Sequence, residues 1–276
     1  MFPTTCFPYN LVPISEYQNI VYSEWLPIML GETRMNDFEL KLDENFQYNK
    51  SVDPSILASF STAAFRFGHS MIDATFAKSN PITGENVKNV SISDTFFDPT
   101  EYEGTGMEMV LKGAQENLAQ ARDRFVTKEL SSRLFKDKDK VILEDSLNLG
   151  QDLNARNIAR GRDHGIPSYG DFYAAFGPTT DTSRSSESWA NVPKTFCKKS
   201  WEMLKNLYMH PKDIDLYTGG LLEKSMKGEG PLGYMFGYII GEQFKRLKHG
   251  DRFFFTHKGT LLYIFNDFVN SFFPAN

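Results

Sequence analysis

The sequence predicts a mainly α-helical protein that folds as a single domain. Apolar residues recur at steps of three and four over residues 51–72, 107–134 and 228–250, which is the spacing of one helix face. Strand-like alternation is rare, and no internal repeat or heptad array is visible. A chain of 276 residues can bury a large core, although by length alone it could also divide into two domains.

The N-terminal part is predicted to hold one helix followed by a loop. Residues 16–31 are expected to form a helix that ends near Pro27, with inward positions at Ile20, Val21 and Trp25. Residues 32–50 are polar and are expected to form the loop.

Residues 51–72 are predicted to form a single helix around which the rest of the chain is arranged. Asp53 and Pro54 suit a helix start, because an aspartate side chain can accept from free backbone N–H groups and proline lacks one. Two apolar stripes adjoin, and one of them consists of Leu57, Phe60, Ala64, Phe67 and Met71. A helix that is apolar nearly all round is normally buried, so its polar residues Arg66 and His69 are the informative ones.

The middle of the chain is predicted to alternate turns with one long helix. Residues 77–89 contain the turn residues Pro81, Gly84 and Asn86, and residues 92–97 are a short apolar run. Residues 107–134 are expected to be a long helix with charged residues outside. The lysine-rich stretch 136–140 is interpreted as a solvated helix end or turn.

The C-terminal half is predicted to contain three helices and a surface loop. Residues 147–158 and 200–208 are expected to be helical, and residues 179–193 to form the loop. In residues 228–250, Pro231 is expected to open a helix that Gly250 ends. Its glycines at four-residue steps leave a smooth strip for close approach of another helix: Gly233, Gly237 and Gly241.

Composition excludes some classes of function. The net charge of -5 and pI near 5.6 argue against a nucleic-acid binder, which would carry a basic patch. No apolar run approaches the roughly 20 residues that cross a bilayer, and the N-terminus lacks the features of a signal peptide. Aromatic residues make up 14% of the chain, which suits either an aromatic core or packing against a flat organic ring. The two cysteines, Cys6 and Cys197, are expected to be unpaired.

His69 is the histidine with the strongest functional context. A buried imidazole serves best as a ligand or base, and a buried arginine such as Arg66 needs an anion, although a core histidine bonded to a backbone carbonyl is the alternative. Asp163 and His164 precede a turn and are interpreted as groups that order a loop. The remaining histidines lack metal-ligand spacing and are expected at the surface: His210, His249 and His257.

Three sequence blocks carry a family resemblance. AFRFGH at 64–69 resembles the proximal-histidine motif of the animal haem peroxidases, and ARNIARGRDHGIPSYGDF at 155–172 is similar to that family's most recognisable segment. DIDLYTGGLLE at 213–223 and the block at 230–255 resemble the family's C-terminal blocks in the same order. The chain, residues 1–276, is thus similar to the C-terminal, proximal part of that domain. The resemblance implies a helical fold that binds haem b.

The resemblance also implies residue roles. His69 would be the proximal axial ligand of the haem iron, with Gly68 leaving room for the porphyrin. Asn157 would accept from the other ring nitrogen, and Arg66 and Arg160 would hold the two haem propionates through paired hydrogen bonds. The alternatives are an Asn157 that bonds its own backbone and arginines that pair with a buried carboxylate such as Asp163.

The resemblance implies that other parts of the family's site lie outside this chain. The family's distal histidine and arginine, its calcium-binding loop and the carboxylates that form ester links to haem precede the matched blocks, so no catalytic residue is expected here. The family reaction is reduction of hydrogen peroxide at the iron, followed by oxidation of a donor. The partners would be haem, peroxide, a donor and the missing N-terminal half or another chain. By resemblance the protein would be extracellular.

Three hypotheses remain open from the sequence. The chain could be a haem peroxidase completed by a missing half, from which alone we expect incomplete activity. It could be a catalytically inactive haem-binding or protein-interaction module, whose proximal face would be a large apolar patch. It could also be a fragment without a function of its own.

Overall fold

The computed structural model describes residues 7–42, 47–136, 150–181, 183, 188–226 and 228–257. Over these residues the fold is mainly α-helical and forms one domain, as the sequence predicts. Here η1 is a π-helical turn and the other η elements are 3-10 helices. The elements follow one another in this order: α1 (Phe7–Ile20), η1 (Val21–Trp25), α2 (Leu26–Asp37), α3 (Ala58–Thr62), η2 (Ala64–Met71), β1 (Thr75–Ser79), β2 (Asn86–Ser91), η3 (Ile92–Thr95), η4 (Thr100–Tyr102), α4 (Gly106–Glu116), α5 (Lys128–Ser131), α6 (Leu153–Asp163), α7 (Tyr169–Phe176), α8 (Lys198–Leu207), η5 (Pro211–Asp213), α9 (Leu216–Leu222) and α10 (Tyr234–Gly250).

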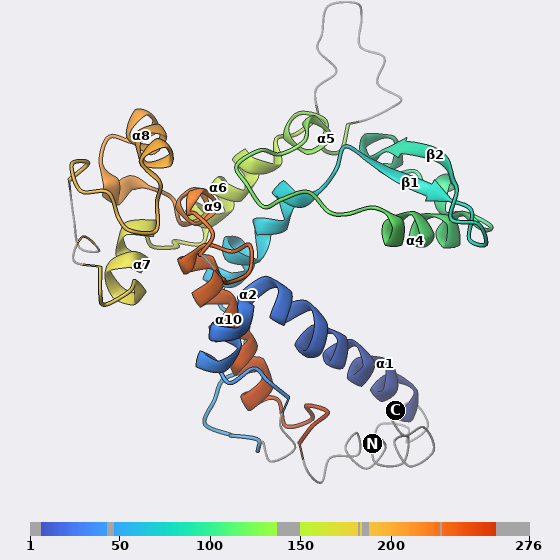
Figure 1. The fold of residues 1–276 in the computed structure, drawn as a ribbon, viewed down its shortest axis with the longest axis horizontal. Coiled ribbons are helices and arrows are strands. Elements are labelled where there is room, and N and C mark those ends of the chain that lie inside the picture. The colour runs from blue at the N-terminus through green and yellow to red at the C-terminus, as the bar shows by residue number, and fades with distance from the viewer. Residues whose placement is uncertain are drawn as a thin grey trace, which may run out of the picture.

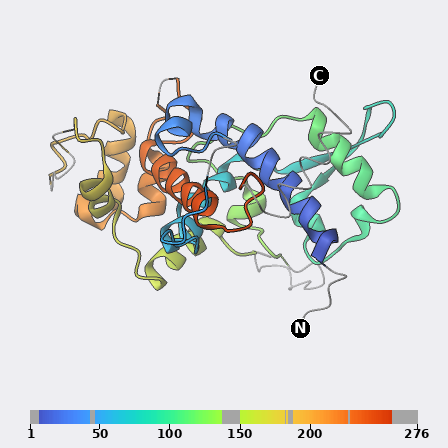
Figure 2. The ribbon, with the colours of Figure 1, turned by 90° about the horizontal axis from the view of Figure 1, so that it is seen from below.

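The elements are spread along one long axis. Helices α7 and α8 lie at one end, the hairpin of β1 and β2 with α4 lies at the other, and α10 runs between them (Figures 1 and 2). Helix α10 packs against α2, α3, α7, α9 and η2. Its inward face is almost fully buried, with Met235, Phe236, Ile239 and Ile240 at most 2% exposed. The core therefore surrounds α10, and η2, which carries His69, packs directly on it.

The glycine strip of α10 is confirmed as a close-packing surface. A Cβ at Gly237 would lie 2.4 Å from Cζ of Arg34, and one at Gly241 would lie 2.4 Å from Cδ2 of Phe38. The prediction that Pro231 opens the helix is wrong, because α10 begins at Tyr234. The Pro231 carbonyl instead accepts from Nε of Arg122 at 2.8 Å and so belongs to the preceding loop.

The predicted helix end near Pro27 is also wrong. The chain continues through η1 into α2, and Pro27 sits in the first turn of α2, directly after the π-helical turn. The wide turn of η1 rotates the inward face by part of a turn. As a result Tyr22 is buried, 4% exposed, while Ile20 is 49% exposed.

Residues 51–72 form two short helices rather than one. The chain breaks at Ala63, with φ −132° and ψ −69°, between α3 and η2. Asp53 does not cap a helix, since its carboxylate accepts from the amide of Ser55 in a local turn. The predicted apolar stripe is nevertheless buried at Phe60, Ala64 and Phe67.

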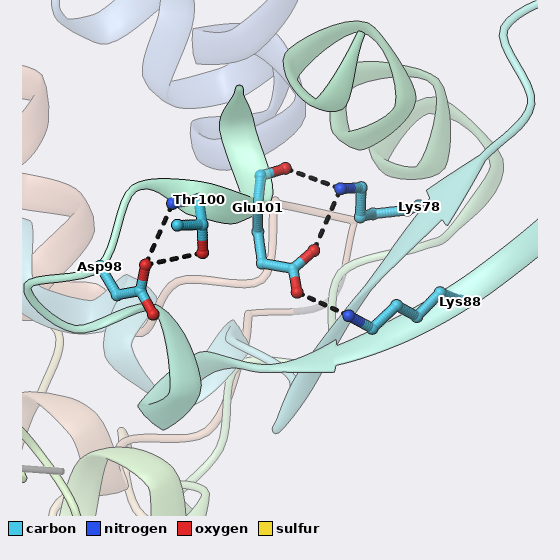
Figure 3. A network of polar contacts seen from close by, with 5 residues as sticks. All are labelled: Lys78, Lys88, Asp98, Thr100 and Glu101. Atoms are coloured by element: carbon cyan, nitrogen blue, oxygen red, sulfur yellow. Dashed lines mark hydrogen bonds and ion pairs between the residues drawn. The ribbon is translucent and has the colours of Figure 1, made fainter. Parts of the chain in front are cut away.

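A β-hairpin occupies the stretch that the sequence suggested to be turns. Strands β1 and β2 pair antiparallel, with Phe76 opposite Val90, and α4 packs on β1. Lys78 donates to the backbone carbonyl of Glu101 at 2.7 Å and pairs with its carboxylate at 3.0 Å, while Lys88 pairs with the same carboxylate at 2.6 Å (Figure 3). The hairpin is thereby fastened to η4. The sequence signal was weak because the strands are short and only partly buried.

The long helix predicted for residues 107–134 is interrupted. Helix α4 ends at Glu116, and only the four-residue α5 is helical beyond it. Between the two, Arg122 leaves any helical path and donates to the carbonyls of Leu221, Glu223 and Pro231 at 2.6, 2.9 and 2.8 Å. These long-range bonds satisfy a buried guanidinium and outweigh local helix propensity.

Other predictions are partly confirmed. Helices α6 and α8 are present, and α6 begins at Leu153, after its Asp152 cap. Within the described part of residues 179–193 no helix or strand forms, while most of residues 136–140 and Cys6 lie outside the described residues. Cys197 is free and exposed.

Of the histidines predicted at the surface, one is buried and one is partly buried. His257 is 2% exposed, and the side chain of His249 is 12% exposed. Burial lowers the pKa of His249 to about 4 and also lowers the pKa of His257. Among the described helices, none combines the length and apolar character needed to cross a membrane.

Candidate functional site

The structure brings His69 and Asn157 together from separate elements. His69 lies near the end of η2 and Asn157 in the middle of α6, and Nδ2 of Asn157 is 2.9 Å from Nδ1 of His69. Asn157 is fully buried, at 0% exposure, so its amide is held in one environment. The alternative in which Asn157 bonds its own backbone does not hold in this arrangement.

Arg66 binds the other end of the same amide. Its Nη1 donates to Oδ1 of Asn157 at 2.8 Å, and its Nε donates to the carbonyl of Ser61 at 2.8 Å. The side chains of His69 and Asn157 are therefore in contact, but the amide of Asn157 has the orientation opposite to the predicted one. We expected the oxygen to face His69, whereas the oxygen faces Arg66 and the amide nitrogen faces the ring.

The electrostatics keep the imidazole neutral. Burial lowers the pKa of His69, and the positive charge of Arg66 lowers it further. The pKa of Arg66 is itself lowered by burial and by the nearby charge of Arg160. A neutral imidazole retains a lone pair, which is the form that binds a metal.

A cavity of about 540 Å³ opens beside this group. Three arginines and one acid contribute to its lining, together with two apolar residues: Arg66, Arg156, Arg160, Asp163, Leu153 and Ala159. The side chains of Arg156 and Arg160 make no hydrogen bond or ion pair with any other residue that the structure describes. The cavity is thus a concentration of positive charge suited to carboxylates.

Two residues of the site were missed by sequence reasoning. Arg156 lies one helical turn before Arg160, and that four-residue spacing was the available signal. Tyr217 in α9 is 4% exposed, lies beside the Asn157 side chain and donates to Oδ1 of Asn154 at 3.0 Å. Burial raises the pKa of Tyr217, so its hydroxyl stays protonated near neutral pH. Tyr217 lies in the block at 213–223. The spacing of residues in that block does not indicate that this tyrosine faces an asparagine on another helix.

The neighbouring polar groups have structural partners. Arg162 forms two bonds with Asp215, at 2.8 and 2.7 Å, as an arginine paired with a carboxylate should. Asp163 is 75% exposed in its side chain, and Nδ1 of His164 lies 3.0 Å from the carbonyl of Arg160. Asp163 and His164 therefore make local contacts at the end of α6 and do not form a catalytic pair.

The residues present fit a haem. Asn157 contacts Nδ1 of His69, so Nε2 is the ring nitrogen that a metal would have to bind, and a Cβ at Gly68 would contact no atom within 4 Å. The described residues contain no cluster of three or more His, Cys, Asp or Glu able to hold a metal ion by themselves. A haem needs only one axial side chain, because the porphyrin supplies the other nitrogens.

Comparison with known proteins identifies the family of the chain. Residues 11–267 match the model of the animal haem peroxidase family. The chain is 34% identical over 250 residues to chorion peroxidase of Drosophila melanogaster, covering 89% of this chain and 29% of that protein. It is 34% identical over 250 residues to Heme peroxidase 2 of Caenorhabditis elegans, covering 88% and 33% respectively. The chain thus spans a third or less of the length of these relatives.

A solved structure shares the fold. Peroxidase A from Dictyostelium discoideum superposes with a TM-score of 0.72 at 27% identity, over 93% of this chain and 45% of that one. The family match includes both η2 with His69 and α6 with Asn157. The chain therefore belongs to the animal haem peroxidase family.

Proposed function

We propose that this chain forms the proximal wall of a haem peroxidase site and holds haem b through His69. Nε2 of His69 would bind the iron, and Arg66 and Arg160 would hold the propionates in the cavity beside α6. The single observation that carries this proposal is the contact of 2.9 Å between His69 and Asn157, two residues 88 positions apart. A second-nitrogen partner of this kind is how proteins hold a metal-ligating imidazole in a fixed orientation.

The chain's own residues would bind and orient the cofactor. Bound haem supplies a redox-active iron at which hydrogen peroxide is reduced and a donor is oxidised. Asn157 fixes the ring of His69, and the arginines of the cavity neutralise the two carboxylates. Burial keeps His69 neutral, so that no proton has to be removed from an imidazolium before it binds.

We propose that the acid–base groups for peroxide come from outside these 276 residues. The cavity beside Arg66 is lined by no histidine. The other described histidines, His164, His210, His249 and His257, are not among its lining residues. A longer polypeptide or a second chain would supply them. In keeping with the family resemblance, we also propose that the protein acts outside the cell.

Hemin titration tests the haem site. We expect a Soret band of a histidine-ligated haem with the wild-type chain and its loss in His69→Ala. His164→Ala is the matched control, because it removes an imidazole from the exposed end of α6. If both variants gave the wild-type spectrum, the proposal would be refuted. Peroxide turnover by the haem-loaded chain is expected to be far below that of a complete peroxidase.

The second candidate is a haem-free protein-interaction module. Its support is a set of exposed large apolar side chains, among them Phe65, Leu118 and Phe125 at 44%, 93% and 62% exposure. Such a surface suits a protein partner. This candidate predicts no spectral change with hemin in the wild-type chain, which separates it from the haem site.

A further inference from the structure

The hydrogen bonds around Asn157 determine where the proton of His69 lies. A guanidinium has donors only, so the atom of Asn157 that faces Arg66 at 2.8 Å must be the oxygen. The amide nitrogen then faces Nδ1 of His69 at 2.9 Å and can only donate to it. Nδ1 must therefore accept, and the single proton of the neutral ring must reside on Nε2.

This arrangement disfavours iron binding. Nε2 needs a free lone pair to coordinate iron, so the ring proton has to be on Nδ1 and has to find an acceptor there. A half-turn of the Asn157 amide would place its oxygen on Nδ1. While Arg66 remains in place, that half-turn would bring the amide nitrogen against a guanidinium N–H, donor against donor.

We infer that Arg66 acts as a positioning residue that couples capture of a carboxylate to the tautomer of His69 through Asn157. This inference rests on the proposed function. Arg66 lines the same cavity as Arg156 and Arg160, so a propionate there would draw its guanidinium away from Asn157. The released amide turns, its oxygen accepts from Nδ1–H, and Nε2 is freed for iron.

The surroundings permit the amide to turn. The Tyr217 hydroxyl lies beside the Asn157 side chain, and a hydroxyl can either donate or accept. It can therefore serve as a partner for the amide in both orientations. The proton balance is simple: Nε2 loses one proton to water and Nδ1 gains one from water, so the ring keeps a single proton throughout.

The first test uses the chain without haem. A two-bond ¹⁵N–¹H spectrum distinguishes the protonated from the unprotonated ring nitrogen, and His69→Gln identifies the signals. We expect the Nε2–H tautomer in the wild type and a mixture with Nδ1–H in Arg66→Met. Arg156→Met is the matched control: it removes the same charge from the same cavity, and its guanidinium makes no bond to Asn157 among the described residues. It should retain the wild-type tautomer.

The second test compares hemin with hemin dimethyl ester, which lacks the free carboxylates. In the wild type, His69 should bind the iron of the ester about tenfold more weakly than the iron of hemin. The ester has no carboxylate to draw Arg66 away, so the charge-assisted hydrogen bond from Arg66 to Asn157 still opposes the turn of the amide. In Arg66→Met the ester should bind His69 more tightly than in the wild type. Asn157→Asp, which offers an oxygen at both ends, should show the Nδ1–H tautomer and a small difference between the two porphyrins.

The outcomes separate the two proposals. A wild-type ring with its proton on Nδ1, or equal behaviour of Arg66→Met and Arg156→Met in the tautomer test, would overturn the coupling. A wild-type chain that gives no His69-dependent band with hemin would overturn the haem site. The tautomer test without haem would still decide the coupling in that case.

Discussion

One buried acid, Glu223, should make a large contribution to the pH dependence of stability. This residue follows α9 and is 2% exposed. Its Oε1 accepts from the Tyr169 hydroxyl at 2.6 Å and its Oε2 from the backbone N–H of Met235 at 2.8 Å. Burial raises the pKa of Glu223 from 4.5 to about 7, even though the charges of Arg34 and Arg122 act to lower it.

The sign of the effect follows from the raised pKa. In the unfolded chain Glu223 releases its proton near pH 4.5, whereas in the folded protein it keeps the proton up to about pH 7. Folding is therefore favoured while the acid is neutral, and the contribution of Glu223 to stability falls as the pH rises from about 4.5 to about 7. A tenfold difference in proton affinity costs about 1.4 kcal/mol, so this shift amounts to roughly 3 kcal/mol.

Glu223→Gln should remove this pH-dependent contribution to stability. A neutral amide can replace the protonated acid, because the Tyr169 hydroxyl can turn to Oγ1 of Thr195, 3.1 Å away. Urea unfolding at pH 5 and pH 8 measures the difference for wild type and variant, with Glu202→Gln, an exposed acid on α8, as control. We expect the wild type and the control to lose about 3 kcal/mol more than Glu223→Gln between these pH values. Equal losses in all three proteins would refute the reasoning.

Three further predictions concern packing and the site. Arg122→Met leaves three backbone carbonyls without their donor, so urea unfolding should show a loss of about 3 kcal/mol; a loss below 1 kcal/mol would contradict it. Gly237→Val places side-chain atoms against the guanidinium of Arg34 and should cost about 2 kcal/mol, and an unchanged melting temperature would argue against the close approach of α2 and α10. Asn157→Ala removes the partner of Nδ1 of His69 and should weaken hemin binding about tenfold or more, whereas wild-type affinity would show that the amide does not support the ligand.

Much of the site could be predicted because its residues lie in contiguous blocks. His69 and Arg66 share one block and Asn157 and Arg160 another, so the two blocks together indicate all four residues. Helix periodicity likewise indicated the buried face of α10, since burial repeats with the period of the helix.

Periodicity failed wherever a distant contact set the local structure. The helix predicted for residues 107–134 is broken because Arg122 binds carbonyls around 100 positions away, at separations of 99, 101 and 109. The hairpin of β1 and β2 escaped notice because its short strands alternate weakly and are fastened by the ion pairs of Glu101.

By itself the sequence determined the helical class, the family and the identity of the residues that meet at the site. Only the tertiary structure decided which way the Asn157 amide faces, that Tyr217 and Arg156 join the group, and that Glu223 is buried. The physical reason is that the spacing of apolar residues along the chain indicates which positions of a helix face the core. The direction of a hydrogen bond depends instead on which donor the fold brings to it, and here that donor is Arg66, 91 positions from Asn157.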